Sequence, residues 1–160
     1  MTNGPRVGLG IDTHRLEPGR PCRLAGVEID STVGPVGHSD GDAILHAVCD
    51  AVLGAIGEDD LGTLFSDQDP SNDQRDSADF CAEALRRVHA AGCVVLSLDV
   101  VVELEYPKLA PHRTAMRHSL AKLFDLTVDR VNVKGKTAEG IGAIGRGEAL
   151  RATAVALLGP

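Results

Sequence analysis

Three side chains with metal-binding chemistry stand at spacings that could bring them together. Asp12 and His14 are two residues apart where apolar residues alternate with small or polar ones, so on a β-strand both point to one face. His46 lies among apolar residues that recur every three or four positions, the period of an amphipathic helix. Two histidines and one carboxylate form a known catalytic zinc ligand set that leaves a fourth position open. The spacing therefore indicates a divalent-metal site between a strand and a helix.

The helix that carries His46 is predicted to begin near residue 40 and to end near Gly57. We expect Ser39 to be its N-cap, with Asp42 three positions later in a variant of the capping box. His38 and Ser39 would then lie at a helix N-terminus, where N–H groups and the helix dipole favour anions. Taken alone, this helix is better explained as a core helix, in which Asp42 offsets the dipole and His46 satisfies one hydrogen bond.

A glycine-rich loop predicted at residues 137–147 carries a second group of polar side chains. Thr137, Glu139 and Arg146 lie within it, and Lys136 comes directly before it. Glycine backbone can approach a ligand closely, and Glu139 could hold a hard ion such as Mg²⁺ together with substrate phosphates. The loop lacks the Gly-Lys-Ser/Thr ending of a P-loop, which argues against ATP hydrolysis. Together with the metal ligands, it indicates phosphoryl chemistry.

The segment from Gly37 to Gly41 offers a competing interpretation, because it matches the G-x-S-x-G nucleophile elbow of serine hydrolases, with Ser39 as the nucleophile. An elbow follows a buried strand, whereas residues 31–36 are expected to form a loop broken by glycine and proline. Ser39 is therefore better explained as a helix cap. A serine hydrolase and a non-catalytic metal-binding module remain the alternative hypotheses.

Composition limits the possible partners and the compartment. The chain has 160 residues and a formal net charge of -7, with one Tyr, three Phe and no Trp, so it lacks the basic and aromatic surface that binds nucleic acid. No apolar run approaches the roughly 20 residues of a membrane helix. Cys22, Cys49, Cys81 and Cys93 form no CxxC pair, and no signal sequence precedes them. We expect four reduced, mostly buried thiols in a cytoplasmic protein.

The hydrophobic pattern predicts one α+β domain that spans residues 1–160. Strands are predicted at residues 6–14, 22–29, 93–104, 128–134 and 148–158, and helices at 40–57, 77–91 and 112–124. Val7, Leu9 and Ile11 are expected to face the core, and the strand at 93–104 is expected to be covered on both sides. These elements favour a mixed β-sheet covered by helices on one face, in a βαβ-type arrangement.

In chain order, the polar motifs resemble those of the 2-C-methyl-D-erythritol 2,4-cyclodiphosphate synthase family. The motifs that carry the resemblance are Gly10 to Arg15, His38 to Asp42 with His46, Asp60 to Gly62 with Phe65, Asp67 to Pro70, Pro107-Lys108, Lys134 to Thr137 with Glu139, and Gly145 to Glu148. The resemblance implies an enzyme of the non-mevalonate isoprenoid pathway. Such an enzyme converts 4-diphosphocytidyl-2-C-methyl-D-erythritol 2-phosphate into the cyclic diphosphate and CMP, through intramolecular attack of the 2-phosphate on the β-phosphorus.

The resemblance also implies roles for individual residues. Asp12, His14 and His46 would bind Zn²⁺, Glu139 would bind Mg²⁺ or Mn²⁺, and His38 and Thr137 would steady the transition state. The methylerythritol part would be held by Asp60, Leu61, Gly62, Phe65, Ser66, Asp67, Gln68 and Asp69. The cytidine diphosphate would be held by Pro107, Lys108, Leu109, Ala110 and Lys136. Further substrate contacts would come from Thr13, Ser39, Ala138, Ala143 and Arg146. The family also implies a homotrimer with sites between subunits.

The chain departs from the usual family pattern at a few positions. A run that commonly reads Thr-Thr-Thr-Glu is Lys136 to Glu139 here, and a common Gly-Glu-Gly is Gly147-Glu148-Ala149. An aromatic residue often found near Ala143 is missing. Thr137 and Glu139 are retained, so the resemblance still implies the same catalysis.

Overall fold

The computed structural model describes residues 4–37, 39–65 and 76–160. The strands are β1 (Arg6–Pro18), β2 (Cys22–Leu24), β3 (Val27–Ile29), β4 (Val33–Pro35), β5 (Val94–Glu103), β6 (Val131–Lys136) and β7 (Ala149–Gly159). The helices are α1 (Ala43–Ile56), α2 (Leu61–Leu64), α3 (Ser77–Ala90), α4 (Arg113–Leu123) and α5 (Gly142–Gly145), with short 3-10 turns η2 (Ala110–His112) and η3 (Val128–Arg130).

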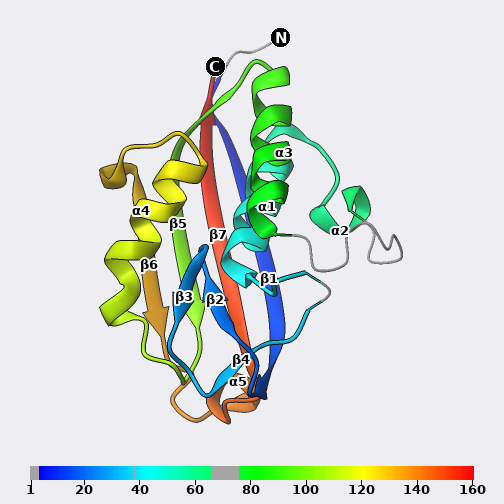
Figure 1. Cartoon of the computed structure of the whole chain (residues 1–160). Helices are drawn as coiled ribbons and strands as arrows, with labels where there is room; N and C mark the ends of the chain where they lie inside the picture. Colours follow the sequence, from blue (N-terminus) through cyan, green and yellow to red (C-terminus); the bar gives the residue numbers. More distant parts are fainter. Residues whose placement is uncertain (1–3, 38, 66–75) are drawn as a thin grey trace.

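One five-stranded sheet organises the chain, in the order β4-β1-β7-β5-β6 (Figure 1). The pair β5 and β6 is parallel, and the other neighbours are antiparallel. The first and last long strands pair along most of their length, from Arg6 opposite Leu158 to Arg15 opposite Ala149. A separate hairpin joins β2 to β3, where a single bent strand was predicted. The mixed sheet predicted from the sequence is confirmed.

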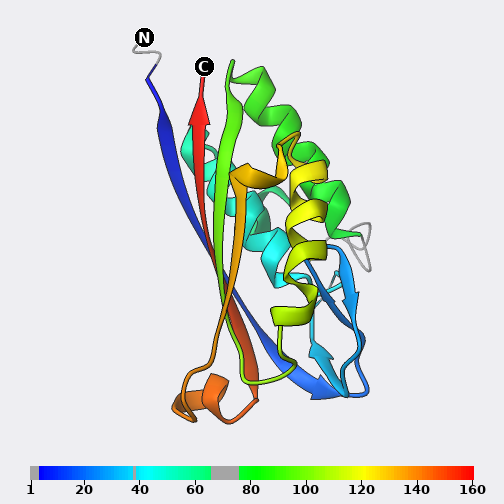
Figure 2. The same cartoon turned by 90° about the vertical axis from the view of Figure 1, so that its left-hand side faces the viewer.

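All three long helices lie on the same side of the sheet, as Figure 2 shows. Helix α1 packs against β1 and β7, α3 packs against α1, and α4 packs against β6. The buried side chains between these layers form one continuous core. The prediction of helices on one face is therefore confirmed. None of the helices in the described ranges has the length and apolar character needed to cross a bilayer.

The inward face of β1 is the opposite of the predicted one. Val7, Leu9 and Ile11 are 53 to 67% exposed, on the face of β1 opposite to that of Gly8 and Gly10. Gly8 and Gly10 face α1 instead, because a Cβ on either would overlap a backbone carbonyl oxygen of the helix, that of Ala51 or Ala47. The expectation that Val7, Leu9 and Ile11 face the core was therefore wrong. The glycines face α1 because their lack of a side chain lets the helix backbone lie directly against the strand.

The start of α1 also differs from the prediction. Asp42, not Ser39, is the N-cap, and the helix begins at Ala43. The buried Asp42 carboxylate accepts hydrogen bonds from the backbone N–H groups of Leu45 (3.1 Å), Ala25 (2.8 Å) and Gly26 (2.6 Å). Burial raises the pKa of Asp42 to about 6, against the opposite effect of these donors. Asp42 thus ties the helix start to the β2–β3 turn.

The remaining elements differ from their predicted forms mainly at their ends. Strand β5 is covered on one face only, since Val94 and Leu96 are exposed, so the prediction of cover on both sides was wrong for the single chain. Strand β1 extends to Pro18, well past the predicted end at residue 14. The predicted loops at 31–36 and 137–147 contain β4 and α5, and the short helix α2 follows α1. All four cysteines are free and buried, as the sequence predicted.

The close packing of α1 on β1 predicts opposite effects for two glycine substitutions. Gly8→Ala should lower the free energy of unfolding by about 2 kcal/mol or more, because the helix must move away from the strand. Gly54→Ala, at an exposed position in α1 where a Cβ meets no atom within 4 Å, should raise it by about 0.5 to 1 kcal/mol. Urea unfolding measures both, and equal stability of the two variants would contradict the packing.

Candidate active site

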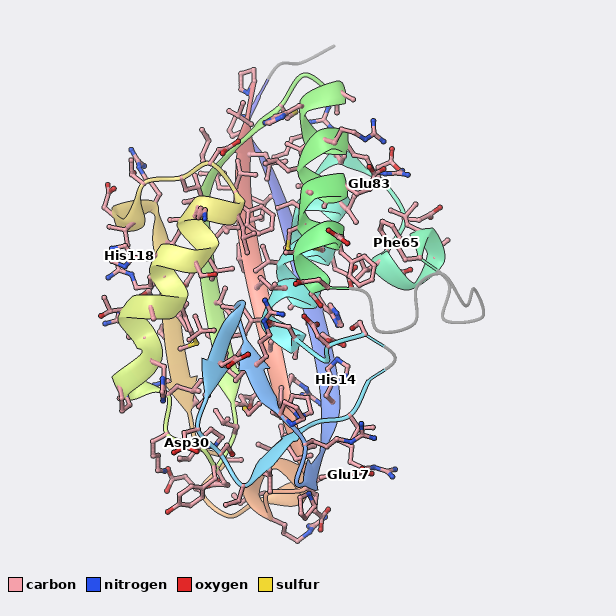
Figure 3. The ribbon with its side chains drawn as sticks, in the orientation of Figure 1. His14, Glu17, Asp30, Phe65, Glu83 and His118 are labelled. Carbon is pink, nitrogen blue, oxygen red and sulfur yellow. The ribbon has the colours of Figure 1, made fainter. Side chains whose placement is uncertain are left out.

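Asp12, His14 and His46 converge on one point between β1 and the start of α1. Oδ2 of Asp12 lies 2.8 Å from Nε2 of His14 and 3.1 Å from Nδ1 of His46. The two histidine nitrogens are 3.4 Å apart. Among the residues that the structure describes, these are the only three His, Cys, Asp or Glu side chains whose ligand atoms cluster in this way, all within 4.8 Å. His14 is labelled in Figure 3, beside the lower end of α1.

Local structure explains the convergence. Asp12 and His14 are on the same face of β1 as Gly8 and Gly10, and these glycines let α1 lie directly against the strand. His46 is in the first turn of α1, on the buried side of the site, and both imidazoles are 13% exposed. Two imidazole nitrogens and a carboxylate oxygen directed at one point are a donor set that suits a divalent metal ion.

Hydrogen bonds behind the two histidines leave the inward nitrogens available. Nδ1 of His14 donates to the carbonyl oxygen of Val36 at 2.8 Å, which leaves Nε2 for a ligand. The Ser77 hydroxyl donates its proton to the carboxylate of Asp40, so it can only accept from Nε2–H of His46, 2.9 Å away. With the proton on Nε2, Nδ1 of His46 carries a lone pair that can coordinate a metal ion. Such outer hydrogen bonds are typical of metal-bound histidines.

The protonation of the cluster follows from its burial and charges. Burial alone would raise the pKa of the Asp12 carboxyl, but hydrogen bonds and charges from His14 and His46 lower it well below its usual value. For His14, burial acts to lower the pKa, while the hydrogen bond and the charge of Asp12 raise it above the ordinary 6.5. The carboxylate is therefore ionised, and a proton on Nε2 of His14 competes with a cation for the same nitrogen.

The contact of Ser77 with His46 and Asp40, which supports the His46 ring, was missed by the sequence reasoning. Ser77 is fully buried at the first position of α3, and Asp40 is held by Nη1 of Arg23 at 3.4 Å. For Ser77 the sequence offered only a helix start near residue 77, and Asp40 stood within the motif His38 to Asp42; neither signal indicates that the two residues touch. The contact is tertiary, so no spacing along the chain could have found it.

Other predicted site residues lie around this centre. The Ser39 hydroxyl is 3.1 Å from Nε2 of His46. Asp60 caps α2, which contains Leu61 and Gly62. The Phe80 ring contacts both the Phe65 ring and the His46 ring in tilted geometry, with centroid distances of 4.8 and 6.0 Å. The side chain of Thr13 lies on the opposite face of β1, where its Oγ1 accepts from Nε of Arg151. His38, Ser66, Asp67, Gln68 and Asp69 lie outside the described residues.

A cavity of about 370 Å³ collects the residues predicted to hold the nucleotide. It lies where β6 meets η2 and α4. Its lining includes the predicted Pro107, Lys108, Leu109, Ala110, Lys136 and Thr137, together with Leu104, Arg113, Met116, Val133, Lys134 and Gly135. The walls are mostly apolar, with lysine and arginine side chains among them, which suits a base attached to anionic phosphates.

The glycine-rich loop continues from this cavity. Thr137, which lines the cavity, donates from Oγ1 to Oε1 of Glu139 at 2.6 Å. Farther along, Ala143 lies in α5, and Arg146 pairs with Glu148 at 2.8 Å. Glu139 does not join the cluster around Asp12. In the sheet, β7 and β5 separate β1, which carries that cluster, from β6, beside which the cavity lies.

Comparison with known proteins places the chain in a family. The sequence profile of the YgbB family matches residues 5–159. The chain belongs to the YgbB family. Members from Rhodopirellula baltica and Gemmatimonas aurantiaca are 46% and 48% identical over 153 residues, which cover 96% of this chain and 92% of each relative. Both are named 2-C-methyl-D-erythritol 2,4-cyclodiphosphate synthase.

Several solved structures are similar to this chain over nearly its whole length. A 2-C-methyl-D-erythritol 2,4-cyclodiphosphate synthase in a CDP-bound form has a TM-score of 0.89 and 46% identity, with 96% of this chain and 99% of that chain covered. A CDP complex of IspF from Plasmodium falciparum has a TM-score of 0.88 and 33% identity, with 100% and 99% covered. The bifunctional IspDF from Campylobacter jejuni has a TM-score of 0.93 and 36% identity over 97% of this chain and 42% of its own.

The contact of Ser77 with His46 predicts a loss of metal affinity on substitution. Ser77→Ala removes the nearer acceptor for Nε2–H of His46, at 2.9 Å, so the affinity for Zn²⁺ should fall about 10- to 100-fold. Competition with a chromophoric chelator measures it, and Ser97→Ala, in β5, is the control. An affinity unchanged from wild type would show that Ser77 does not orient the histidine.

The raised pKa of His14 predicts how pH affects the metal-free and metal-bound protein. The raised value means that the stability contributed by protonated His14 is fully present below pH 6.5 and is lost as pH rises through the folded-state pKa. Bound Zn²⁺ competes with this proton. The rise in Tm on adding Zn²⁺ should therefore be larger at pH 8 than at pH 6, and the reverse order in calorimetry would contradict the assignment.

Proposed function

We propose that this protein is a 2-C-methyl-D-erythritol 2,4-cyclodiphosphate synthase, a metal-dependent phosphorus–oxygen lyase. Its substrate would be 4-diphosphocytidyl-2-C-methyl-D-erythritol 2-phosphate, and its products the cyclic diphosphate and CMP. The observation that carries the proposal is the convergence of Asp12, His14 and His46 on one point. It occurs in a chain that matches the family from residue 5 to residue 159.

Two metal ions fit the donors that the chain provides. Asp12, His14 and His46 would hold Zn²⁺, which accepts mixed nitrogen and oxygen ligands. Glu139 would hold Mg²⁺ or Mn²⁺ together with substrate phosphates, since one carboxylate plus phosphate oxygens suits those ions. When bound, both ions would supply positive charge to the phosphate oxygens.

The chain's own residues would mainly bind and orient the substrate. The cavity beside β6 would take the cytidine diphosphate, with Lys108 and Lys136 near its phosphates and Thr137 at the reacting end. His38 and Thr137 are assigned to the transition state by family resemblance. Nucleophile and electrophile belong to one molecule and the attacking phosphate is already anionic, so alignment and charge neutralisation suffice without a strong base.

A homotrimer with sites between subunits is part of the proposal. Val7, Leu9, Ile11 and Val155 leave an apolar sheet face exposed in the single chain, and such faces are usually covered by a partner. The metal cluster and the cavity also lie on strands that are not neighbours. A site completed by a second copy would account for both features. The four free cysteines favour the reducing cytoplasm as its compartment.

The metal site predicts the effect of removing one ligand. His46→Ala should reduce CMP release from the cytidine diphosphate substrate at least about 100-fold, while the metal-free protein keeps a Tm near wild type because the domain has its own core. His118→Ala, on the exposed face of α4, is the matched control and should release CMP at the wild-type rate. Unchanged CMP release by His46→Ala would contradict the proposal.

One observation favours a second candidate, a serine hydrolase. The Ser39 hydroxyl lies 3.1 Å from Nε2 of His46, whose Nδ1 lies 3.1 Å from Asp12, the order of contacts in a hydrolytic triad. Against it, the buried Ser77 hydroxyl is nearer to the same nitrogen, at 2.9 Å. Covalent labelling of Ser39 by a fluorophosphonate, lost in Ser39→Ala, would support the hydrolase, and absence of labelling would exclude it.

The other alternative is a metal-binding module without catalysis. Such a protein would bind the ion but would release no CMP from the cytidine diphosphate substrate.

A further inference from the structure

Glu105, just after β5, holds the backbone of the loop that carries Glu139. Its Oε1 accepts hydrogen bonds from the backbone N–H groups of Ala138, at 2.9 Å, and Gly140, at 3.4 Å. These two amides flank Glu139 on either side. One carboxylate oxygen of Glu105 therefore binds the backbone on both sides of Glu139, the residue that the proposed function assigns to Mg²⁺ or Mn²⁺.

The backbone at Glu139 has a conformation that its own side chain does not favour. The N–H of Ile141 donates to the carbonyl oxygen of Ala138 at 2.8 Å, which closes a tight turn. The two central residues, Glu139 and Gly140, have φ values of 52° and 77°. Positive φ at both positions is typical of type I′ turns, which prefer Asn, Asp or Gly rather than glutamate. The conformation must be held by contacts from outside the turn.

The contacts available to hold this turn come from β5 and from the loop itself. The N–H of Leu104 donates to the carbonyl oxygen of Lys136 at 2.9 Å, which sets the end of β5 beside the end of β6. Glu105 is the next residue, so its carboxylate reaches the turn. The Glu139 side chain is fixed separately, by the hydroxyl of Thr137. Backbone and side chain of Glu139 are thus held by two different partners.

We propose that Glu105 is a positioning residue for Glu139. As a double acceptor, its carboxylate keeps the turn in the left-handed form that presents the Glu139 carboxylate to the divalent ion and its phosphates. The inference rests on the proposed function, in which Glu139 binds that ion. Since Glu139 and Gly140 are exposed, the contact orders a surface loop and is not needed by the core.

Two substitutions separate the acceptor role of Glu105 from its charge. Glu105→Gln keeps an oxygen that can accept both N–H groups, whereas Glu105→Ala removes it. Binding of Mn²⁺ in the presence of CDP, followed by electron paramagnetic resonance, should be about 10-fold weaker in Glu105→Ala, as for other outer hydrogen bonds to metal ligands. Glu105→Gln should stay within about 2-fold of wild type. The control Glu103→Ala, at the preceding strand end, should bind Mn²⁺ like wild type.

Steady-state kinetics then test whether the weaker Mn²⁺ binding of Glu105→Ala also changes the metal dependence of CMP release. In Glu105→Ala the Mn²⁺ concentration for half-maximal CMP release should rise by the same factor as the dissociation constant, while the Tm and the zinc content stay at wild-type values. Equal Mn²⁺ affinities of wild type and Glu105→Ala would overturn the inference, and so would a Gln variant as weak as the Ala variant. A wild-type protein that releases no CMP would instead contradict the proposed function, while the Mn²⁺ measurement would still decide the role of Glu105.

Discussion

The contact of α1 with β1 is the constraint on which the rest of the structure depends. Gly8 and Gly10 have no side chain to keep the helix away, so backbone meets backbone. Farther along the same face, Asp12 and His14 then lie within reach of His46. With ordinary side chains at the two glycines, the helix would stand farther from the sheet and the three ligand atoms would not share one point. Packing and chemistry are set by the same few residues.

Fixing the helix start and the histidine rings completes the site. Asp42 binds three backbone N–H groups and ties α1 to the β2–β3 turn, while Ser77 and Val36 hold the outer nitrogens of the histidines. Apart from the cap contact between Asp42 and Leu45, each of these contacts joins segments far apart in the sequence. The same holds on the other side of β7 in the sheet, where Glu105, just after β5, binds the backbone of the loop that carries Glu139. Both candidate ligand groups therefore have rigid supports before any ion binds.

The sequence predicts which residues share a face of a strand, but it does not predict which of the two faces is buried. Alternation places Asp12 and His14 on one face whichever face is buried, so their partnership could be predicted, whereas the burial of Val7 could not, because it depends on where α1 packs. Ser39 and Asp42 are both good N-caps, and only the tertiary contacts of Asp42 decide between them. The family resemblance, confirmed by the match over residues 5–159, gathered cavity residues that no local pattern would connect.

The central claim is that Asp12, His14 and His46 bind one ion together. Titration of the metal-free protein with Co²⁺, followed by its visible absorption, tests this most directly, because the spectrum reports the number and type of ligands. We expect one tightly bound Co²⁺ per chain with the intense bands of a low-coordinate site, lost on replacing any one of the three residues with alanine. A spectrum unchanged by all three substitutions, or the weak bands of a fully hydrated ion in the wild type, would contradict the account.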